Sequence, residues 1–554
     1  GKNDNAVWLP DTFGFGWAMP QILKKSGIDV FFTSKLSWNQ SSRFPYDTFW
    51  WEGIDGSRVL ASFLTVPANG FPPQPWSTTY NGEISPQTLR QAWELYQNKE
   101  ISRDLLYLYG YGDGGGGSTR TMIKRLRALR ELPLQMDIRF DTAGGFFETL
   151  IEQAMRSDTP VWNGELYLEC HRGTYTSQAF AKRENRRLEL RLCDSEFFQT
   201  LRWLQSGGAV PAEDLFEQWQ ILLRNQFHDI LPGSSIHAVY DDLRREYAAL
   251  HAALDKKDGA WFAERANSEG YTVWNVSGWA RNALVELPAN GKVRWLDEAG
   301  NKIESVPVSD GRYLLALRGI KPFSAACIVS QETEDESESI GELASVDLSH
   351  RTIETPLYVV QWANNGQLTR VYAKEQGFEL FADGEAGNQL IAYEDEPEMF
   401  DAWDIDASYT EHYALVEDLI SVVVVENNAL RTIVRFTFSY GLSLLTQDMV
   451  FQRDDAAILF QHFVDWHEHQ RLLRAEFPLN IASDVAIFDI PFGNMARPTA
   501  HRTAFDQARF EVPAHQWVDL SEPGKGVSLL NDCKYGHSAK GNRLGLSLIK
   551  SAID

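Results

Sequence analysis

The sequence is poor in cysteine and in long apolar runs. Its 554 residues include only four cysteines, and no two of them form a Cys-x-x-Cys pair. A disulfide framework or a cysteine zinc knuckle needs a denser pattern, so we expect free thiols and a cytoplasmic location. No run approaches the roughly 18 to 20 apolar residues of a membrane-spanning helix, so a membrane is not an expected partner.

Positive charge is also scarce. The chain has 52 lysines and arginines against 76 aspartates and glutamates, which gives a formal net charge of −24. Phosphate groups are repelled over most of such a surface. Nucleic acids and anionic lipids are therefore excluded as expected partners.

What the chain does contain is typical of a folded multidomain protein, with 44% apolar and 12% aromatic residues. Residues 1–140 alternate β-rich and helical runs, which predicts part of an α/β catalytic domain. Residues 141–265 are almost purely helical in pattern, which predicts a helical bundle domain. Residues 266–554 combine strand-like runs with glycine and asparagine turns, which predicts a β-sandwich region.

Local signals in the first region predict individual elements. A short helix over 19–26 is followed by Gly27 at a natural C-terminal position, and a buried strand is expected over 28–33. Ser85 and the proline after it predict the start of a second helix. Residues 105–109 are expected to form a further core strand that ends in a glycine-rich loop.

Two aspartates follow predicted strands, where α/β folds bind their ligands. Asp11 lies in the segment Trp-Leu-Pro-Asp-Thr-Phe-Gly, after a short apolar run; the alternative is that it caps a helix that begins near Trp17. Asp113 lies among glycines, which let a ligand approach the backbone closely. A carboxylate held there suits a sugar-sized cavity, and the alternative is a flexible surface turn.

Two further segments carry candidate groups. His228 follows a predicted amphipathic helix and precedes Asp229, so it is either a metal ligand or a histidine favoured by the helix dipole. Residues 164–175 mix aromatic and polar side chains. That mixture suits a sugar-binding wall and a half-buried strand equally well.

Taken together, these segments resemble glycoside hydrolase family 38, in its cytosolic and bacterial α-mannosidase branch. The resemblance runs in collinear order along nearly the whole chain. The segments that carry it are WLPDTFG at 8–14, FPYDTFWWEGIDGSRVL at 44–60, YGYGDGGGGSTR at 109–120, GELYLECHRGTYTSQ at 164–178, NQFHDILPGSSI at 225–236 and FDAWDID at 400–406. We therefore expect a partial, seven-stranded-barrel-like α/β layer, a three-helix bundle and a β-sandwich region.

The resemblance implies zinc-assisted, retaining hydrolysis of terminal α-mannosides through a covalent glycosyl-aspartate. Asp11 would be both nucleophile and zinc ligand, His228 a second zinc ligand, and Asp113 the general acid/base. Asp229 would contact the substrate or orient the site. The sugar pocket would also contain Phe13, Lys35, His171 and Tyr175.

The chain departs from the family pattern in one respect. The family's zinc site also uses a His-x-Asp motif near the amino terminus, and no such triplet occurs in this sequence. Two further zinc ligands are accordingly expected upstream of Gly1, and the chain is expected to be a fragment that is also incomplete at its carboxyl end.

The expected partner is an α-mannoside, either an oligosaccharide or a small mannoside. Two alternatives stay open: a related hydrolase of phosphorylated mannosyl-glycerate, which a basic cluster at the sugar pocket would favour, and a non-catalytic carbohydrate-binding remnant. Large enzymes of this family are often dimeric, so a homodimer is retained as a candidate assembly.

Overall fold

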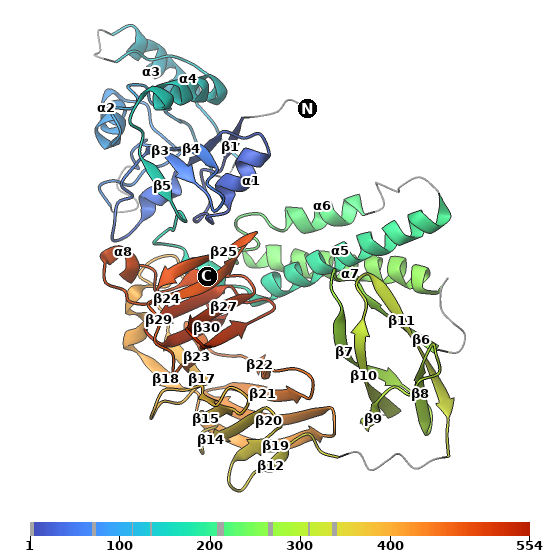
Figure 1. Ribbon diagram of the computed structural model, residues 1–554. Helices are drawn as coiled ribbons and strands as arrows, with labels where there is room; N and C mark the ends of the chain where they lie inside the picture. The colour runs from blue at the N-terminus through green and yellow to red at the C-terminus, as the bar shows by residue number, and fades with distance from the viewer. Residues whose placement is uncertain are drawn as a thin grey trace.

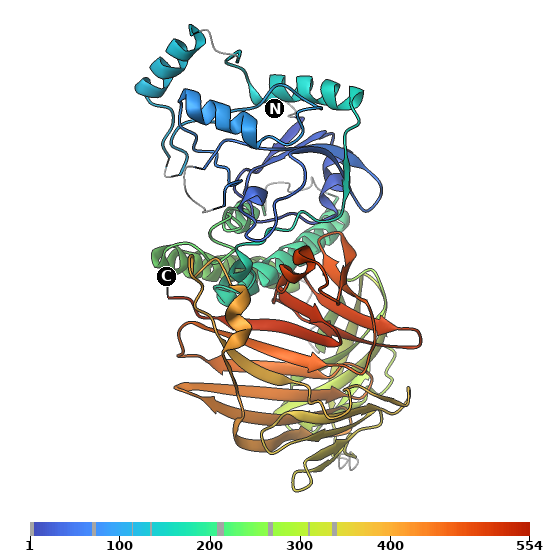
Figure 2. The same ribbon diagram turned by 90° about the vertical axis from the view of Figure 1, so that its left-hand side faces the viewer.

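The computed structural model describes residues 5–68, 74–113, 115–132, 136–207, 215–263, 270–308, 311–334 and 341–553. An α/β layer comes first, long helices follow, and several sheets form the remainder (Figure 1). Seen from the side, the long helices lie between the α/β layer and the sheets (Figure 2). The expected multidomain order of α/β, helical and β regions is confirmed at this level.

Five strands form the sheet of the α/β layer, in the order β1-β2-β4-β3-β5. All neighbouring pairs are parallel except β3 and β4, which are antiparallel. The carboxyl ends of β1, β2 and β4 therefore meet at one edge of the sheet, where α/β folds place their ligands. The strands are β1 (Ala6–Trp8), β2 (Val30–Thr33), β3 (Thr48–Glu52), β4 (Arg58–Phe63) and β5 (Val161–Asn163).

Local sequence signals explain several of these elements. All four residues of β2 are buried, as expected for a continuous apolar run between two layers. Helix α1 (Met19–Lys25) ends at Ser26, and Gly27 follows with a φ of 78°, the left-handed conformation that ends many helices. Helix α2 (Pro86–Leu95) has the predicted cap, since the side chain of Ser85 accepts a hydrogen bond from the backbone of Thr88.

The α/β layer continues past residue 140, the expected limit of this domain. Helices α3 (Arg120–Arg130) and α4 (Ala143–Arg156) belong to this part of the fold. The side chains of Phe147 and Leu150 in α4 pack against Val30 and Leu60 of the sheet. Strand β5 then pairs with β3, so the sheet is completed only at Asn163.

The expected core strand over residues 105–109 is wrong. In this segment only Tyr109 takes part in a β-bridge, an isolated parallel one to Gly82. The apolar residues there serve packing instead, because Leu106, Tyr107 and Leu108 contact the cluster that includes Val66. An extended apolar run needs a neighbour along its whole length to become a strand, and this one meets its neighbour at a single point.

Three helices follow and share one core, which contains Leu188, Leu192, Leu222, Tyr247 and Leu254. They are α5 (Ala179–Ser206), α6 (Phe216–Arg224) and α7 (His237–Ala263). Within the described ranges, none of the helices combines the length and apolar character that crossing a membrane requires.

Two three-stranded sheets come next and enclose a common core around Trp295, Leu315 and Ile328. The first sheet has the order β7-β10-β9 and the second β6-β11-β8. Their strands are β6 (Gly270–Asn275), β7 (Arg281–Pro288), β8 (Val293–Asp297), β9 (Ser305–Val308), β10 (Arg312–Ile320) and β11 (Ser324–Glu332).

Four more sheets make up the rest of the chain and pack around a large shared core that includes Val434, Met449 and Leu473. Three of the orders are β12-β13-β14-β15-β16, β18-β17-β23-β30-β29-β26 and β19-β20-β21-β22, and the fourth is β25-β24-β27-β28. The elements are β12 (Ser345–Asp347), β13 (Thr352–Glu354), β14 (Tyr358–Trp362), β15 (Leu368–Ala373), β16 (Phe378–Glu379), β17 (Gln389–Glu394), β18 (Tyr413–Leu415), β19 (Asp418–Asn427), β20 (Arg431–Tyr440), β21 (Ser443–Gln452), β22 (Leu459–Asp465), β23 (Arg471–Pro478), β24 (Val485–Ile490), β25 (Gly493–Pro498), α8 (Ala504–Gln507), β26 (Val512–Pro513), β27 (Trp517–Glu522), β28 (Lys525–Leu530), β29 (Gly536–Lys540) and β30 (Arg543–Lys550).

A buried ion pair joins the α/β layer to these sheets. The guanidinium of Arg497 in β25 lies 2.7 Å from a carboxylate oxygen of Glu165, and both side chains are almost wholly buried. Burial raises the pKa of Glu165, but the charge and hydrogen bonds of Arg497, together with the charge of Arg509, outweigh it and hold that pKa below its usual value. The pair therefore keeps a carboxylate ionised inside the interface.

We expect Arg497→Met to destabilise the protein by about 3 kcal/mol, because it removes both hydrogen bonds that Arg497 donates to the buried Glu165 carboxylate and leaves Arg509, 3.7 Å away, to offset its charge. Urea unfolding followed by tryptophan fluorescence measures this as a lower midpoint. The matched control is Arg502→Met, which removes an exposed arginine 3.9 Å from Asp484. That variant should change stability by less than about 0.5 kcal/mol, and an equal effect of both would contradict the expectation.

Candidate active site

Asp11 lies at the shared edge of the parallel strands, just after β1. The chain is held there by Leu9, whose amide donates to the carbonyl of Phe32, and by Ser34, whose hydroxyl donates to the carbonyl of Pro10 at 2.8 Å. Helix α1 has Ala18 at its N-cap position, with no side-chain hydrogen bond to the helix. The alternative of Asp11 as a helix cap is therefore excluded.

Two groups stabilise the charge of the Asp11 carboxylate. The ammonium of Lys35, at the start of the 3₁₀ helix η1 (Lys35–Trp38) after β2, lies 3.1 Å from Oδ1 and 3.3 Å from the centre of the Trp38 ring. The hydroxyl of Tyr80 donates to Oδ2 at 2.6 Å. Burial raises the pKa of Asp11, but Lys35, Tyr80 and the nearby His228 outweigh it and hold that pKa below its usual value.

The same hydroxyl of Tyr80 also contacts Asp113, with 2.8 Å between the phenolic oxygen and Oδ1. Because Asp11 Oδ2 lies 2.6 Å from that phenolic oxygen, the two carboxylate oxygens are at most 5.4 Å apart. The second oxygen of Asp113 accepts a hydrogen bond from the amide of Asn81 at 3.0 Å. Burial, together with the two carboxylates, raises the pKa of Tyr80 far above its usual value, so the phenol stays protonated.

Sequence reasoning missed Tyr80 and Asn81, and the signal that could have found them is the glycine that follows. A Cβ atom on Gly82 would lie 2.3 Å from the carbonyl oxygen of Leu108, so only glycine lets these two segments run side by side. Asn81 Oδ1 also accepts a hydrogen bond from the amide of Gly112 at 2.7 Å. Close packing at Gly82 thus places the side chains of Asn81 and Tyr80 next to the loop that carries Asp113.

His228 and Asp229 reach the site from a turn after α6. His228 Nε2 lies 3.7 Å from Asp11 Oδ2 and 3.6 Å from Asp229 Oδ2. The hydroxyl of Ser234 donates to Asp229 Oδ1 at 2.9 Å, and Tyr240 donates to the backbone carbonyl of Asp229. The turn is thereby fixed with its imidazole directed at Asp11.

The turn is also tied to the helical region by a buried lysine. Lys182 in α5 donates from its ammonium to the carbonyl oxygens of Ser177, Leu231 and Pro232. Burial lowers the pKa of Lys182 to about 7. Gly233 has a φ of 96° and would place a Cβ only 2.5 Å from the carbonyl oxygen of Ser177, so the two backbones touch at this point.

An oxygen of Asp11 and a nitrogen of His228 form a donor pair suited to zinc. Zinc lies about 2.0 to 2.2 Å from such ligands, so an ion between these atoms can span their 3.7 Å separation. Across the described ranges, no three histidine, cysteine, aspartate or glutamate side chains are arranged to hold a metal ion. The described residues therefore supply two candidate ligands, Asp11 and His228, and Lys35 contacts the other oxygen of Asp11.

Aromatic rings form a wall beside Asp11. The ring of Phe13 lies 4.4 Å from that of His171 and 6.3 Å from that of His228. Burial and the nearby Lys35 lower the pKa of His171 to about 3, so its imidazole is neutral. Tyr175, predicted for the same pocket, lies at the end of the 3₁₀ helix η2 (Arg172–Tyr175). Burial and the nearby Tyr167 raise the pKa of its phenol, and Tyr167 itself donates a hydrogen bond to the backbone of the β-region at Glu511.

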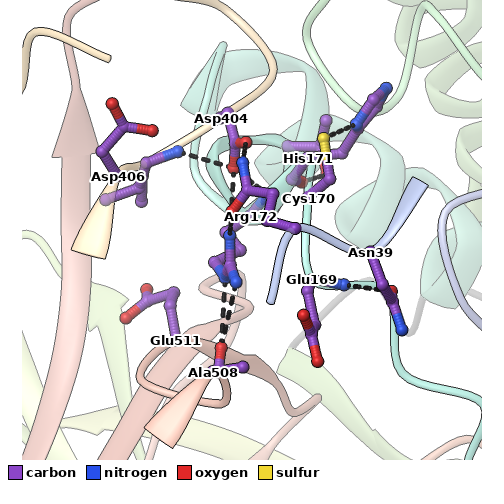
Figure 3. Close-up of polar contacts among 12 residues, drawn as sticks. Asn39, Glu169, Cys170, His171, Arg172, Asp404, Asp406, Ala508 and Glu511 are labelled. Atoms are coloured by element: carbon purple, nitrogen blue, oxygen red, sulfur yellow. Dashed lines mark hydrogen bonds and ion pairs between the residues drawn. The ribbon is translucent and has the colours of Figure 1, made fainter. Parts of the chain in front are cut away.

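The wall is held in place by two segments of the distant β-region, one at Asp404 and one at Ala508 (Figure 3). The Sγ atom of Cys170 lies 2.8 Å from His171 Nδ1. The next residue, Arg172, donates its backbone amide to Asp404 and its guanidinium to the carbonyl of Ala508. Segments more than 200 residues apart thus hold His171 in its left-handed conformation, with a φ of 61°.

The site combines two opposed carboxyl groups, a phenol between them, and an imidazole beside one carboxylate. Paired carboxyl groups are the groups that glycoside hydrolases use for acid/base and nucleophilic chemistry. The geometry is therefore typical of a glycosidase-type site.

Comparison with known proteins gives the family. Residues 1–165 match the glycosyl hydrolases family 38 N-terminal domain, residues 169–257 the alpha mannosidase middle domain, and residues 353–554 the glycosyl hydrolases family 38 C-terminal domain. The chain belongs to glycoside hydrolase family 38, which confirms the resemblance of the sequence motifs.

Curated relatives match over the whole chain. Alpha-mannosidase 2C1 of Homo sapiens is 35% identical over 561 residues, Alpha-mannosidase G of Dictyostelium discoideum 34% over 602, and Alpha-mannosidase of Saccharomyces cerevisiae 31% over 582. All three alignments cover 100% of this chain, and 51%, 53% and 48% of the respective relatives. The chain thus spans about half the length of the curated relatives it matches.

Solved structures share the fold at low sequence identity. An alpha-mannosidase from Enterococcus faecalis V583 superposes with a TM-score of 0.80 at 15% identity, covering 100% of this chain and 71% of that one. A protein in the glycosyl hydrolase family 38 from Enterococcus faecalis gives 0.70 at 13% identity, with 98% and 69% covered.

We expect Gly82→Ala to cost about 1 to 3 kcal/mol, because the new Cβ would overlap the Leu108 carbonyl and force apart the segments that carry Tyr80 and Asp113. The matched control is Gly117→Ala in the neighbouring loop, where a Cβ meets nothing within 4 Å. Urea unfolding should separate the two variants clearly. Equal midpoints would contradict the role given to Gly82.

Proposed function

We propose that the complete protein is a retaining α-mannosidase, which cleaves terminal α-linked mannose through a covalent glycosyl-aspartate. The observation that carries this proposal is the carboxylate pair, whose nearest oxygens are at most 5.4 Å apart. Retaining glycosidases need two carboxyl groups about 5 to 5.5 Å apart, whereas inverting enzymes need a wider gap for water. Mannose is supported by the names of the relatives.

In this proposal Asp11 is the nucleophile and Asp113 the general acid/base. Asp11 is half-buried and stabilised as an anion by Lys35, as attack on the anomeric carbon requires. Asp113 is exposed, so the oxygen of a departing group can reach it. Asp113 donates its proton to that oxygen as the glycosidic bond breaks, and later removes a proton from the water that releases mannose from Asp11.

The phenol between the carboxyl groups supports this division of roles. Tyr80 has one hydroxyl proton, yet its oxygen lies within hydrogen-bond distance of both Asp11 and Asp113. A proton on one of the two carboxyl groups would let each contact be a full hydrogen bond with a proton of its own. In the proposed mechanism Asp113 carries this proton and donates it to the phenolic oxygen, while Tyr80 donates to Asp11. Asp113 then holds the proton that it delivers to the leaving group.

Zinc fits this proposal as a cofactor that Asp11 and His228 would help to hold. Zinc sites take three or four protein ligands, so these two would be part of the full set. When bound, the ion would supply positive charge for gripping sugar hydroxyls. The chain's own residues orient the imidazole of His228, because Ser234 and Tyr240 hydrogen-bond to the turn that carries it.

The alternative of a phosphorylated mannosyl-glycerate substrate gains no support from the pocket cations. Lys35 is already paired with Asp11, and Arg172 with Asp404. A phosphate needs cations that are free to bind it. An α-mannoside without phosphate is therefore the substrate that we propose.

We also propose a cytoplasmic location, because all four cysteines are free thiols. The helices α5, α6 and α7 are proposed to be the family's three-helix bundle, on the strength of their common core. The five-stranded sheet is proposed to be part of a larger, barrel-like layer.

The test is hydrolysis of an aryl α-mannoside by the complete protein, supplied with zinc. We expect Asp11→Asn to lower kcat by about 10³-fold or more, because no carboxylate remains to attack. Asp113→Asn should lose about 10²- to 10⁴-fold for a poor leaving group, and less for a good one, which needs no proton. Retention of the anomeric configuration is read by NMR.

Asp137→Asn is the control, since this aspartate is exposed and pairs only with the exposed Arg139 among the residues described. It should leave the rate unchanged. Mannose binding without turnover in the unmodified complete protein would favour the carbohydrate-binding alternative. Inverted product would overturn the assignment of Asp11.

A further inference from the structure

An exposed tyrosine stands beside the proposed acid/base. The side chain of Tyr111 is 62% exposed, although tyrosine is a large and largely apolar residue. By contrast, Tyr109 at the start of the same loop packs into a cluster with Ile84 and Leu126. Between Tyr109 and Ser118, glycine accounts for every residue except Tyr111 and Asp113. The ring of Tyr109 therefore contributes to the packing of the fold, whereas the ring of Tyr111 is exposed and accessible to a ligand.

The base of this ring is held in place. The amide of Tyr111 donates to the carbonyl of Gly117 at 3.1 Å, and the amide of the next residue, Gly112, donates to Asn81 at 2.7 Å. A Cβ on Gly116 would lie 2.8 Å from both the Cβ and the carbonyl oxygen of Tyr111, so the second half of the loop packs tightly against the backbone of Tyr111. Such anchoring lowers the entropy lost when a ligand binds.

The position of Tyr111 in the loop indicates what its side chain would contact. Tyr111 and Asp113 are two residues apart, so their Cα atoms lie within about 7 Å, roughly the span of one sugar ring. A general acid must reach the glycosidic oxygen, and the group beyond that oxygen consequently lies next to the acid. Tyrosine offers a flat apolar face and a polar tip at low entropic cost, which suits the C–H face and hydroxyls of a sugar.

We propose that Tyr111 forms the platform for the departing sugar, and that the complete enzyme therefore favours mannose linked to another sugar ring over mannosides with small leaving groups. The inference rests on the proposed function. It assigns Tyr111 a contact with the leaving group alone, separate from the groups around Asp11 that would contact the mannose itself.

Two substrates separate this contact from the chemistry. In α-mannobiose the leaving group is a whole sugar, whereas in α-mannosyl fluoride it is one atom that cannot reach a platform. For the complete protein with zinc, we expect Tyr111→Ala to lower kcat/KM for mannobiose about tenfold, mainly through KM, and to change it less than about twofold for the fluoride. Tyr111→Phe should keep both values, because stacking needs the ring and not the hydroxyl.

Phe216→Ala is the matched control, since it removes a ring that is 59% exposed at the start of α6, and it should alter neither substrate. Equal losses on both substrates with Tyr111→Ala would overturn the proposal, because the residue would then act by positioning Asp113. Unchanged kinetics would overturn it as well. A wild-type enzyme that cleaves neither substrate would refute the proposed function, and the platform with it.

Discussion

The contact of one phenol with two carboxyl groups is the constraint on which the site depends. Tyr80 sets the distance between Asp11 and Asp113, and its place is set in turn by Gly82, where two backbones approach too closely for any side chain. Two carboxyl groups at this distance repel each other whenever both are ionised, and the shared hydroxyl between them, with Lys35 on the far side, offsets that repulsion. Backbone packing thus determines the electrostatics of the site.

Three parts of the fold converge on this constraint. The parallel strands deliver Asp11 and Lys35 to one edge of the sheet, and the helical region delivers His228 through the turn that Lys182 holds. The β-region fixes the wall, through Asp404. Each contribution ends in a buried or half-buried polar contact, because unpaired polar groups at such junctions would be costly.

The sequence predicts local features best. The apolar run of β2, the glycine after α1 and the Ser85 cap are all consequences of neighbouring residues, and all were predictable. Asp11, Asp113 and His228 could be selected by their motifs, and the structure brings them together. The strand expected over 105–109 is absent because pairing depends on a partner that no local pattern reveals. Tyr80 could not be predicted for the same reason, because its role comes from contacts with Asp113 and Asp11, which are 33 and 69 residues away in the sequence.

The wall residue His171 extends this reasoning to the whole chain. Its left-handed backbone is disfavoured for a residue with a Cβ, so the conformation persists only while its surroundings impose it. Those surroundings are Arg172 bound to Asp404, and the amide of Thr174 bound to the carbonyl of Trp403. Both acceptors lie in the FDAWDID segment, about 230 residues further along the chain. The α/β layer alone therefore contains the paired carboxyl groups but not the contacts that hold the wall beside them, and these contacts make the β-region part of the site.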